Sequence, residues 1–348
     1  MRFETVCIDY RNVVSELSRV IHDTGLGYRG PRTSEKPALR SQLLTPQMAG
    51  VLDRIRRAAR PPFHTLTPVA ARAAYEAAAE VLDLPRAPLP RVQNLQLPGG
   101  DGQPRPARLY AASALPSPGL LYLHGGGFVI GSLETHDSLC RQLALRSGCA
   151  IVSLDYRLAP EHPFPAAVDD TWAALEALLQ HPASAGIERL IGVGGDSAGG
   201  TLAAVAALHA RDRGWPLALQ LLITPGTTAH ADTASHKLFA DGFLLDAATI
   251  AWMFDHTIPH AHRRDWRFAP LEADVDGVAP ACVILAECDP LVDEGLAYAD
   301  RLRAAGVPVA LELVRGVTHD FIKMGRALRE AQPALAAAAA AIHEAAQT

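Results

Sequence analysis

Cysteine is scarce in this sequence, and no two cysteines stand in a C-x-x-C pair. The odd count and irregular spacing argue against a disulfide framework and favour a reducing compartment, the cytoplasm. Two of the cysteines stand within apolar runs and are expected to be small core residues. The five cysteines are Cys7, Cys140, Cys149, Cys282 and Cys288, of which Cys149 and Cys282 are the two in apolar runs.

Long apolar runs are also missing. No stretch approaches the roughly 18 uninterrupted apolar residues that a transmembrane helix needs, so no membrane span is expected. Residues 1–5 (MRFET) carry charges where a signal peptide would need an apolar run, so we expect no secretory leader.

The sequence has no excess of positive charge. A formal charge of −5 argues against nucleic acid as the main partner, because phosphate binding needs a concentrated basic surface. The one basic cluster, residues 54–60 (RIRRAAR), is better explained as the solvated C-terminal part of a helix that Pro61 and Pro62 end.

What the sequence does contain is enough apolar material for a large core. With 348 residues, 49% hydrophobic and 20% charged, it suits one large globular domain, with or without a cap. From about residue 91, short apolar runs alternate with helical segments, which predicts a mostly parallel sheet with helices on both faces. Runs at 91–97 and 105–111 flank a Pro-Gly-Gly-Asp-Gly turn and predict an antiparallel hairpin at its start.

We expect two regions outside the sheet to form a helical cap. Residues 1–90 are predicted to be an N-terminal helical arm or cap, with a clear helix start at Thr67 and Pro68. Residues 91–348 are predicted to be the catalytic domain, interrupted at about 226–270 by an insertion with a helix over 245–254. An insertion of that length between neighbouring strands is usually functional.

The stretch 190–200 (LIGVGGDSAGG) places a serine at a sharp junction. An apolar strand ends in glycines, and a helix begins at Ala198, so Ser197 stands in a strand–turn–helix G-x-S-x-G motif. Such a turn lifts the serine Oγ from the sheet edge and aims the helix N-terminus at a developing oxyanion. By itself the pattern also fits a tight crossover with a spare serine.

Three further loops follow predicted strands, at the edge where parallel sheets bind ligands. Residues 124–127 (HGGG) leave backbone N–H groups unshielded, as half of an oxyanion hole would require, with His124 expected to hold the loop by a hydrogen bond. Asp289 is the favoured histidine-orienting carboxylate over Asp293 and Glu294, which could instead cap the helix starting near Gly295.

His319 follows the last predicted strand. The order serine, aspartate, histidine is the triad order of α/β-hydrolase sheets. A serine hydroxyl becomes nucleophilic when an imidazole takes its proton, and a buried carboxylate keeps that imidazole correctly turned. Ser197, Asp289 and His319 are therefore the predicted catalytic residues.

Five motifs together resemble those of the bacterial hormone-sensitive-lipase-like esterases of the α/β-hydrolase superfamily, over residues from about 90 to 330. The resemblance implies an α/β-hydrolase fold and a serine carboxylesterase of short-to-medium acyl esters. It implies an oxyanion hole of Gly125, Gly126 and Ala198, and a scaffold role for Asp155, Arg157 and Glu161. The motifs are 124–128 (HGGGF), 155–161 (DYRLAPE), 195–200 (GDSAGG), 289–295 (DPLVDEG) and 316–321 (GVTHDF).

The departures from that family concern substrate choice. Residues 224–227 (TPGT) replace a pattern that often carries Tyr-Pro, Thr201 stands where the family often has Asn, and the first 90 residues match poorly. An amidase, a lactonase or an acyltransferase would share the same machinery, and a non-catalytic binding relative would be expected to lack the histidine. The expected partner is a small ester, and the expected state is a monomer or a homodimer.

No metal or cofactor is expected. His256, His260 and His262 could suggest metal ligands, but Pro259 breaks the helical spacing and no cysteine or carboxylate completes a set, which favours an exposed cap loop. Four aromatic residues near them could line an apolar pocket or form the core of the cap: Trp252, Phe254, Trp266 and Phe268.

Overall fold

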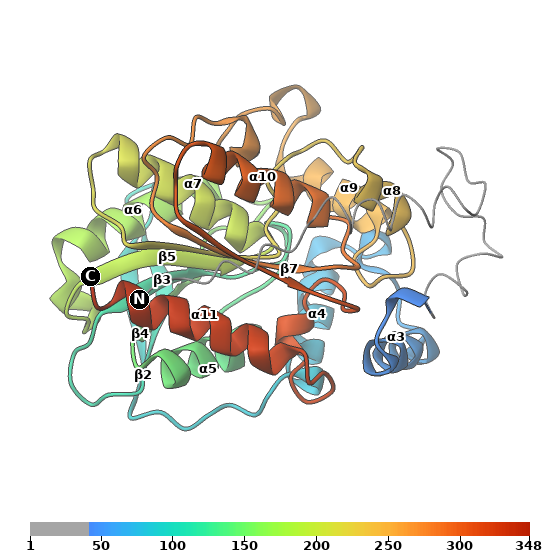
Figure 1. Cartoon of the computed structure of the whole chain (residues 1–348), viewed down its shortest axis with the longest axis horizontal. Coiled ribbons are helices and arrows are strands. Elements are labelled where there is room, and N and C mark those ends of the chain that lie inside the picture. Colours follow the sequence, from blue (N-terminus) through green and yellow to red (C-terminus); the bar gives the residue numbers. More distant parts are fainter. Residues whose placement is uncertain (1–41) are drawn as a thin grey trace. The chain divides into compact units, whose positions relative to one another are not determined.

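A twisted sheet of eight strands runs through the described residues, 42–348, of the computed structural model (Figure 1). In chain order the strands are β1 (Arg91–Pro98), β2 (Pro104–Ala111), β3 (Gly119–Leu123), β4 (Ala150–Leu154), β5 (Leu190–Asp196), β6 (Leu219–Ile223), β7 (Ala281–Ala286) and β8 (Val309–Val314).

The sheet order is β1-β2-β4-β3-β5-β6-β7-β8. β1 pairs antiparallel with β2, and β2 pairs antiparallel with β4. All other neighbouring strands are parallel. The predicted mostly parallel sheet with a leading antiparallel hairpin is thus confirmed.

The central strands are apolar because helices cover both of their faces. Every residue of β3, β4, β6 and β7 is buried, as expected for parallel strands without a solvent side. The main helices are α3 (Pro46–Ala58), α4 (Pro68–Leu82), α5 (Asp137–Ser147), α6 (Ala166–Gln180), α7 (Ala198–Asp212), α8 (Ala234–Leu238), α9 (Ala247–Thr257), α10 (Val292–Ala304) and α11 (Ala331–Ala345).

The helices form two layers around the sheet. Figure 1 shows α5 and α11 on one face, and α6, α7 and α10 on the other. The strands therefore run between two layers of helices, and their carboxyl ends open towards a third group of elements.

That third group contains α4, α8 and α9, which Figure 1 shows together at one end of the sheet. A buried cluster joins Ala71 of α4 and Met253 of α9 to Val129 and Ile130, which follow β3. The α4 helix begins as predicted, with Thr67 Oγ1 accepting the Ala70 N–H at 3.3 Å and Pro68 in the first turn. These contacts place α4 and α9 over the loop that carries the three glycines.

Residues Leu43–Thr348 make up one compact unit, which includes α3 and α4 as well as the sheet. The division into 1–90 and 91–348, with an insertion at about 226–270, stays a prediction. Residues 1–41 of the predicted arm, and Cys7 with them, lie outside the described residues. Helix α3 ends at Ala58 with its arginines exposed, as the sequence indicated.

None of the helices in the described part of the chain is long and apolar enough to cross a membrane. Four cysteines in this part are free and buried: Cys140, Cys149, Cys282 and Cys288.

Candidate active site

Ser197 stands at a strained turn between β5 and α7. Its backbone has φ 53° and ψ −122°, a region that non-glycine residues rarely occupy and that is found at functional sites. The turn is too tight for flanking side chains, because a Cβ on Gly199 would lie 1.9 Å from the Leu123 carbonyl oxygen and one on Gly195 would lie 2.3 Å from the Gly199 oxygen. This packing accounts for both glycines of the motif.

Asp289 and His319 form a buried pair. Nδ1 of His319 lies 2.7 Å from Oδ2 of Asp289, and the two residues are 5% and 1% exposed. The Leu291 N–H donates to Asp289 Oδ1 at 2.9 Å and fixes the carboxylate. Burial by itself lowers the pKa of His319, but the Asp289 carboxylate outweighs it and raises that pKa to about 9. The pair is built to stabilise an imidazolium.

The competing carboxylates have other partners. Asp293 and Glu294 lie in the first turn of α10, where Asp293 Oδ2 accepts the Ser235 N–H at 2.8 Å and Glu294 Oε1 accepts the Thr227 N–H at 2.6 Å. Both therefore hold the chain that follows β6, and neither contacts His319. The capping role considered for them is not observed, because α10 begins at Val292, before both residues, and has no side-chain cap hydrogen bond.

The three predicted catalytic residues all follow the carboxyl ends of parallel strands in the same half of the sheet. Ser197 comes directly after β5, Asp289 follows β7, and His319 follows β8. No hydrogen bond joins the Ser197 hydroxyl to His319 within residues 42–348. Catalytic hydrogen bonds are often long without substrate and tighten in the Michaelis complex.

The glycine loop presents a different pair of amides from the expected one. The N–H of Gly125 points at Nε2 of His136, 3.3 Å away in the protein interior. The N–H groups of Gly126, Gly127 and Ala198 have no acceptor among the described residues. The unoccupied donors are therefore one residue further along the loop than the resemblance implied.

His124 holds the loop in place. Its Nδ1 donates to the Gly125 carbonyl oxygen at 2.9 Å, and its ring stacks on Tyr156 with centroids 4.3 Å apart. Burial, together with the neighbouring His136 imidazole, lowers the pKa of His124 to about 3, so the ring is neutral. These contacts fit the expected structural role.

The 155–161 stretch connects the sheet to the cap. The Tyr156 hydroxyl donates to the His124 carbonyl oxygen at 2.7 Å, Arg157 pairs with buried Asp170 at 2.8 Å, and Glu161 pairs with Arg72 of α4 at 2.6 Å. The Arg157 and Glu161 contacts are those of a scaffold.

Sequence reasoning missed several polar residues beneath the elbow. Tyr122 donates to Oδ1 of Asp196 at 2.7 Å, and His136 Nε2 lies 3.1 Å from Oδ2. Lys323, only 6% exposed, donates to the Tyr75 hydroxyl at 2.8 Å and so links α4 to the chain that follows His319. The sequence signal for these residues is a polar side chain within an apolar or helix-start pattern. Such a signal does not identify the residue that the side chain contacts.

The aromatic residues near the cap differ in how deeply they are buried. Phe268 is buried, and its ring centroid lies 5.1 Å from that of Phe254 and 5.4 Å from that of Phe128, so these rings form core. Trp252 is only partly buried and packs on the cluster beside the glycine loop. Of the four, Phe268 alone is buried, and Trp252, Phe254 and Trp266 are partly buried.

The histidine cluster does not assemble as a metal site. His256 lies in the last turn of α9, and His260 and His262 are exposed in a short 3-10 helix. In the part of the chain that the structure describes, no group of three or more His, Cys, Asp or Glu side chains could hold a metal ion.

Comparison with known proteins gives consistent results along the chain. A family model described as the α/β hydrolase fold matches residues 120–323. The chain is 40% identical over 284 residues to ethyl acetate hydrolase from Pseudomonas putida, covering 79% of this chain and 89% of that protein. It is 40% identical over 240 residues to the carboxylesterase NlhH of Mycobacterium tuberculosis, covering 66% of this chain and 74% of that one.

Solved structures agree with this. An ester-hydrolase from the metagenome of Lake Arreo is 39% identical and covers 88% of this chain and all of its own, with a TM-score of 0.82. An esterase from Pyrobaculum calidifontis is 36% identical with a TM-score of 0.80, covering 86% of this chain and 98% of that one.

Proposed function

Since this chain belongs to the α/β-hydrolase family and is a carboxylic ester hydrolase, we propose that it cleaves short-to-medium acyl esters through an acyl-enzyme on Ser197. His319 is the proposed general base and Asp289 the carboxylate that orients it. The observation that carries the proposal is the buried 2.7 Å contact between His319 Nδ1 and Asp289 Oδ2, at the sheet edge where the strained Ser197 turn also lies.

Acylation begins with proton transfer. His319 Nε2 takes the hydroxyl proton as Ser197 Oγ bonds to the ester carbonyl carbon, and the carbonyl oxygen becomes an oxyanion. Collapse of this intermediate breaks the bond to the alkoxy oxygen, which leaves as the alcohol with the proton from His319. Water then attacks the acyl-enzyme with His319 again as base, and the carboxylic acid is released.

The oxyanion hole is proposed to consist of the Gly126, Gly127 and Ala198 amides. Gly126 and Ala198 were expected from the sequence, whereas the N–H of Gly125 is directed at His136. Preorganised donors of this kind stabilise the charge that develops in the transition state, and removing one typically reduces kcat by about 10²–10³.

The acyl preference follows from the cap and from the relatives. Trp252 and Met253 of α9 crowd the glycine loop, which favours small acyl groups. The relatives named above include an ethyl acetate hydrolase, whose named substrate carries a two-carbon acyl group.

The proposed location is the cytoplasm, supported by the free buried thiols of the described part. The proposed unit is a monomer or a homodimer, because every group named in the mechanism comes from a single chain.

The direct test is S197A with a short p-nitrophenyl ester. The proposal predicts loss of hydrolysis with circular dichroism and thermal unfolding unchanged. Near-parent turnover by that variant would overturn the assignment of Ser197.

A further inference from the structure

His136 contacts both the nucleophile elbow and the glycine loop from the protein interior. It is fully buried and stands at the residue before α5. Its Nε2 lies 3.1 Å from Oδ2 of Asp196, the residue before Ser197, and 3.3 Å from the N of Gly125, the residue before Gly126. One imidazole thus spans the gap between the nucleophile elbow and the glycine loop.

Both ring nitrogens of His136 have polar partners. Nδ1 lies 2.8 Å from Thr135 Oγ1, which is itself 2.9 Å from the Ser132 carbonyl oxygen. Nε2 faces Oδ2 of Asp196 and the N–H of Gly125.

Both carboxylate oxygens of Asp196 have partners. Burial by itself raises the pKa of the Asp196 carboxyl, but His136 beside it lowers the pKa by more, so the acid is ionised. Tyr122 donates to its other oxygen at 2.7 Å. Nε2 of His136, 3.1 Å from Oδ2 of Asp196, is within hydrogen-bonding distance of this buried carboxylate.

The same ring nitrogen also contacts the glycine loop. The Gly125 N–H points at Nε2 at 3.3 Å in the protein interior. One side chain is therefore in contact with both the residue before Ser197 and the residue before Gly126.

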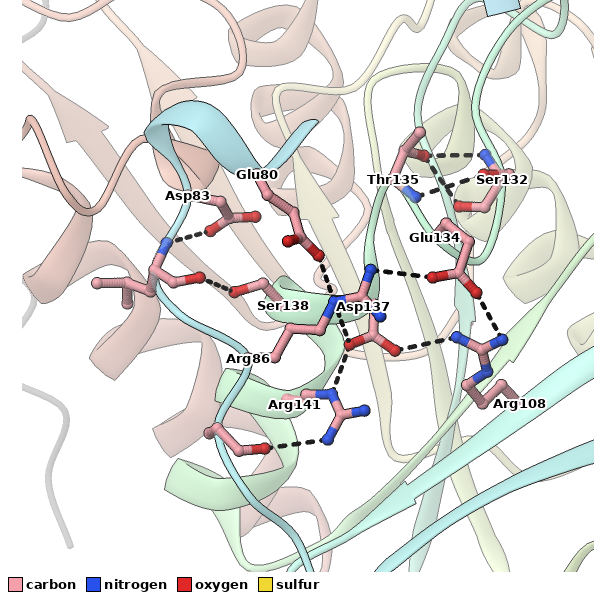
Figure 2. Close-up of polar contacts among 12 residues, drawn as sticks. Glu80, Asp83, Arg86, Arg108, Ser132, Glu134, Thr135, Asp137, Ser138 and Arg141 are labelled. Carbon is pink, nitrogen blue, oxygen red and sulfur yellow. Dashed lines mark hydrogen bonds and ion pairs between the residues drawn. The ribbon is translucent and has the colours of Figure 1, made fainter. Parts of the chain in front are cut away.

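The segment that carries His136 is itself held rigidly. Asp137, fully buried, faces the guanidinium groups of Arg86, Arg108 and Arg141 (Figure 2). Figure 2 also shows hydrogen bonds between Ser132 and Thr135, the residue that precedes His136. The segment that carries His136 is therefore held by ion pairs, one of them to Arg86 in the chain that follows α4.

We propose that His136 is a positioning residue for ester hydrolysis: it sets the distance between the glycine loop and the Ser197 elbow by bonding Asp196 against the backbone of Gly125. This rests on the proposed roles of Ser197 and of the Gly126 and Gly127 amides. His136 does not touch the substrate and exchanges no proton with it. A misplacement of about 1 Å in such a site can reduce the rate about 10²-fold.

Two matched substitutions separate its contacts. H136N places an amide near the Nδ1 position, where it can bond Thr135 but cannot reach Asp196. H136Q extends to the Nε2 position and can still donate to Asp196. We expect H136N to lower kcat by about 10²-fold with KM within about twofold, and H136Q to recover at least about tenfold of that loss.

A second readout excludes a merely structural role. An aryl trifluoromethyl ketone adds to the nucleophile and places an oxyanion in the hole, so its affinity should fall in H136N by the same factor as kcat/KM. H343N is the control, because His343 bonds the Ser147 carbonyl oxygen at 3.0 Å on α11, away from the elbow. It should leave both values unchanged.

S197A is the reference variant against which the results for H136N and T135V are interpreted. If H136N does not fold, T135V leaves the imidazole in place while removing the hydrogen-bond partner of its Nδ1, and it should lower kcat without raising KM. Parent-like kcat in H136N, or in T135V where H136N is unfolded, beside an inactive S197A, would overturn the role of His136 alone. Turnover by S197A would overturn the serine mechanism instead.

Discussion

Met253 of α9 lies so close to Gly127 that a Cβ added to Gly127 would come within 2.0 Å of its sulfur. The cap helix therefore rests directly on the loop that is proposed to hold the oxyanion. Thr257 of the same helix also contacts the Gly127 carbonyl oxygen at 3.5 Å, so we expect a shift of α9 to displace the loop.

The first prediction concerns that contact. G127A should lower kcat by about 10²-fold, because the methyl group has no room and displaces the amides of the loop. Steady-state kinetics on p-nitrophenyl acetate measures it. M253A added to G127A should restore part of the rate by removing the obstructing sulfur. G50A is the matched control, as a Cβ on Gly50 meets nothing within 4 Å.

The second prediction concerns pH. The active form needs neutral His319, whose pKa is raised to about 9 by Asp289, so kcat/KM should rise with pH up to about 9. D289N removes the negative charge and should move this limb to lower pH, while kcat falls by up to about 10⁴-fold. A limb that stays at the same pH in D289N would show that another group is titrating.

A third prediction concerns stability. Asp170 is fully buried and accepts hydrogen bonds from Arg157 and from the Gly100 N–H. Removing one partner of a buried ion pair leaves the other uncompensated, so D170A should lower the free energy of unfolding by about 3–5 kcal/mol. Urea denaturation measures it. D255A breaks an exposed pair with Arg263 and should change stability by less than about 1 kcal/mol.

The pH dependence of that stability has a definite sign. Burial raises the pKa of Asp170, but the hydrogen bonds from Arg157 and the backbone lower it by more, so the folded pKa lies below the unfolded one. Such a group stabilises the fold above its unfolded pKa of about 3.9, and the contribution is lost as pH falls through the folded value. The stability gap between parent and D170A should therefore narrow in acid; a gap that widens below about pH 4 contradicts this account.

The fourth prediction concerns the substrate. In a series of p-nitrophenyl esters from about C2 to C12, kcat/KM should be highest at the short end, because Trp252 and Met253 crowd the site. W252A should move the maximum towards longer chains. A parent maximum at about C10 or above would contradict the pocket proposed here.

Much of this architecture could be predicted from local sequence. The apolar runs gave the strands, and the order of Ser197, Asp289 and His319 after them gave a pair that the structure brings to 2.7 Å. Pattern and order are local properties, and parallel strands bring their carboxyl ends to one edge.

The polar support of the site could not be predicted in the same way. The direction of the Gly125 N–H depends on His136, eleven positions later in the chain, and Tyr122 stands in a strand that looks like pure core. Lys323 meets Tyr75 across 248 positions. Such contacts depend on tertiary packing, which apolar periodicity does not encode.

The central claim is that Ser197 carries the acyl group. Incubation with a fluorophosphonate, followed by intact-mass and peptide-level mass spectrometry, tests it most directly. The account predicts one adduct, located on Ser197, that forms as activity is lost and is absent from S197A. An adduct on another residue, or full inactivation without modification of Ser197, would contradict it.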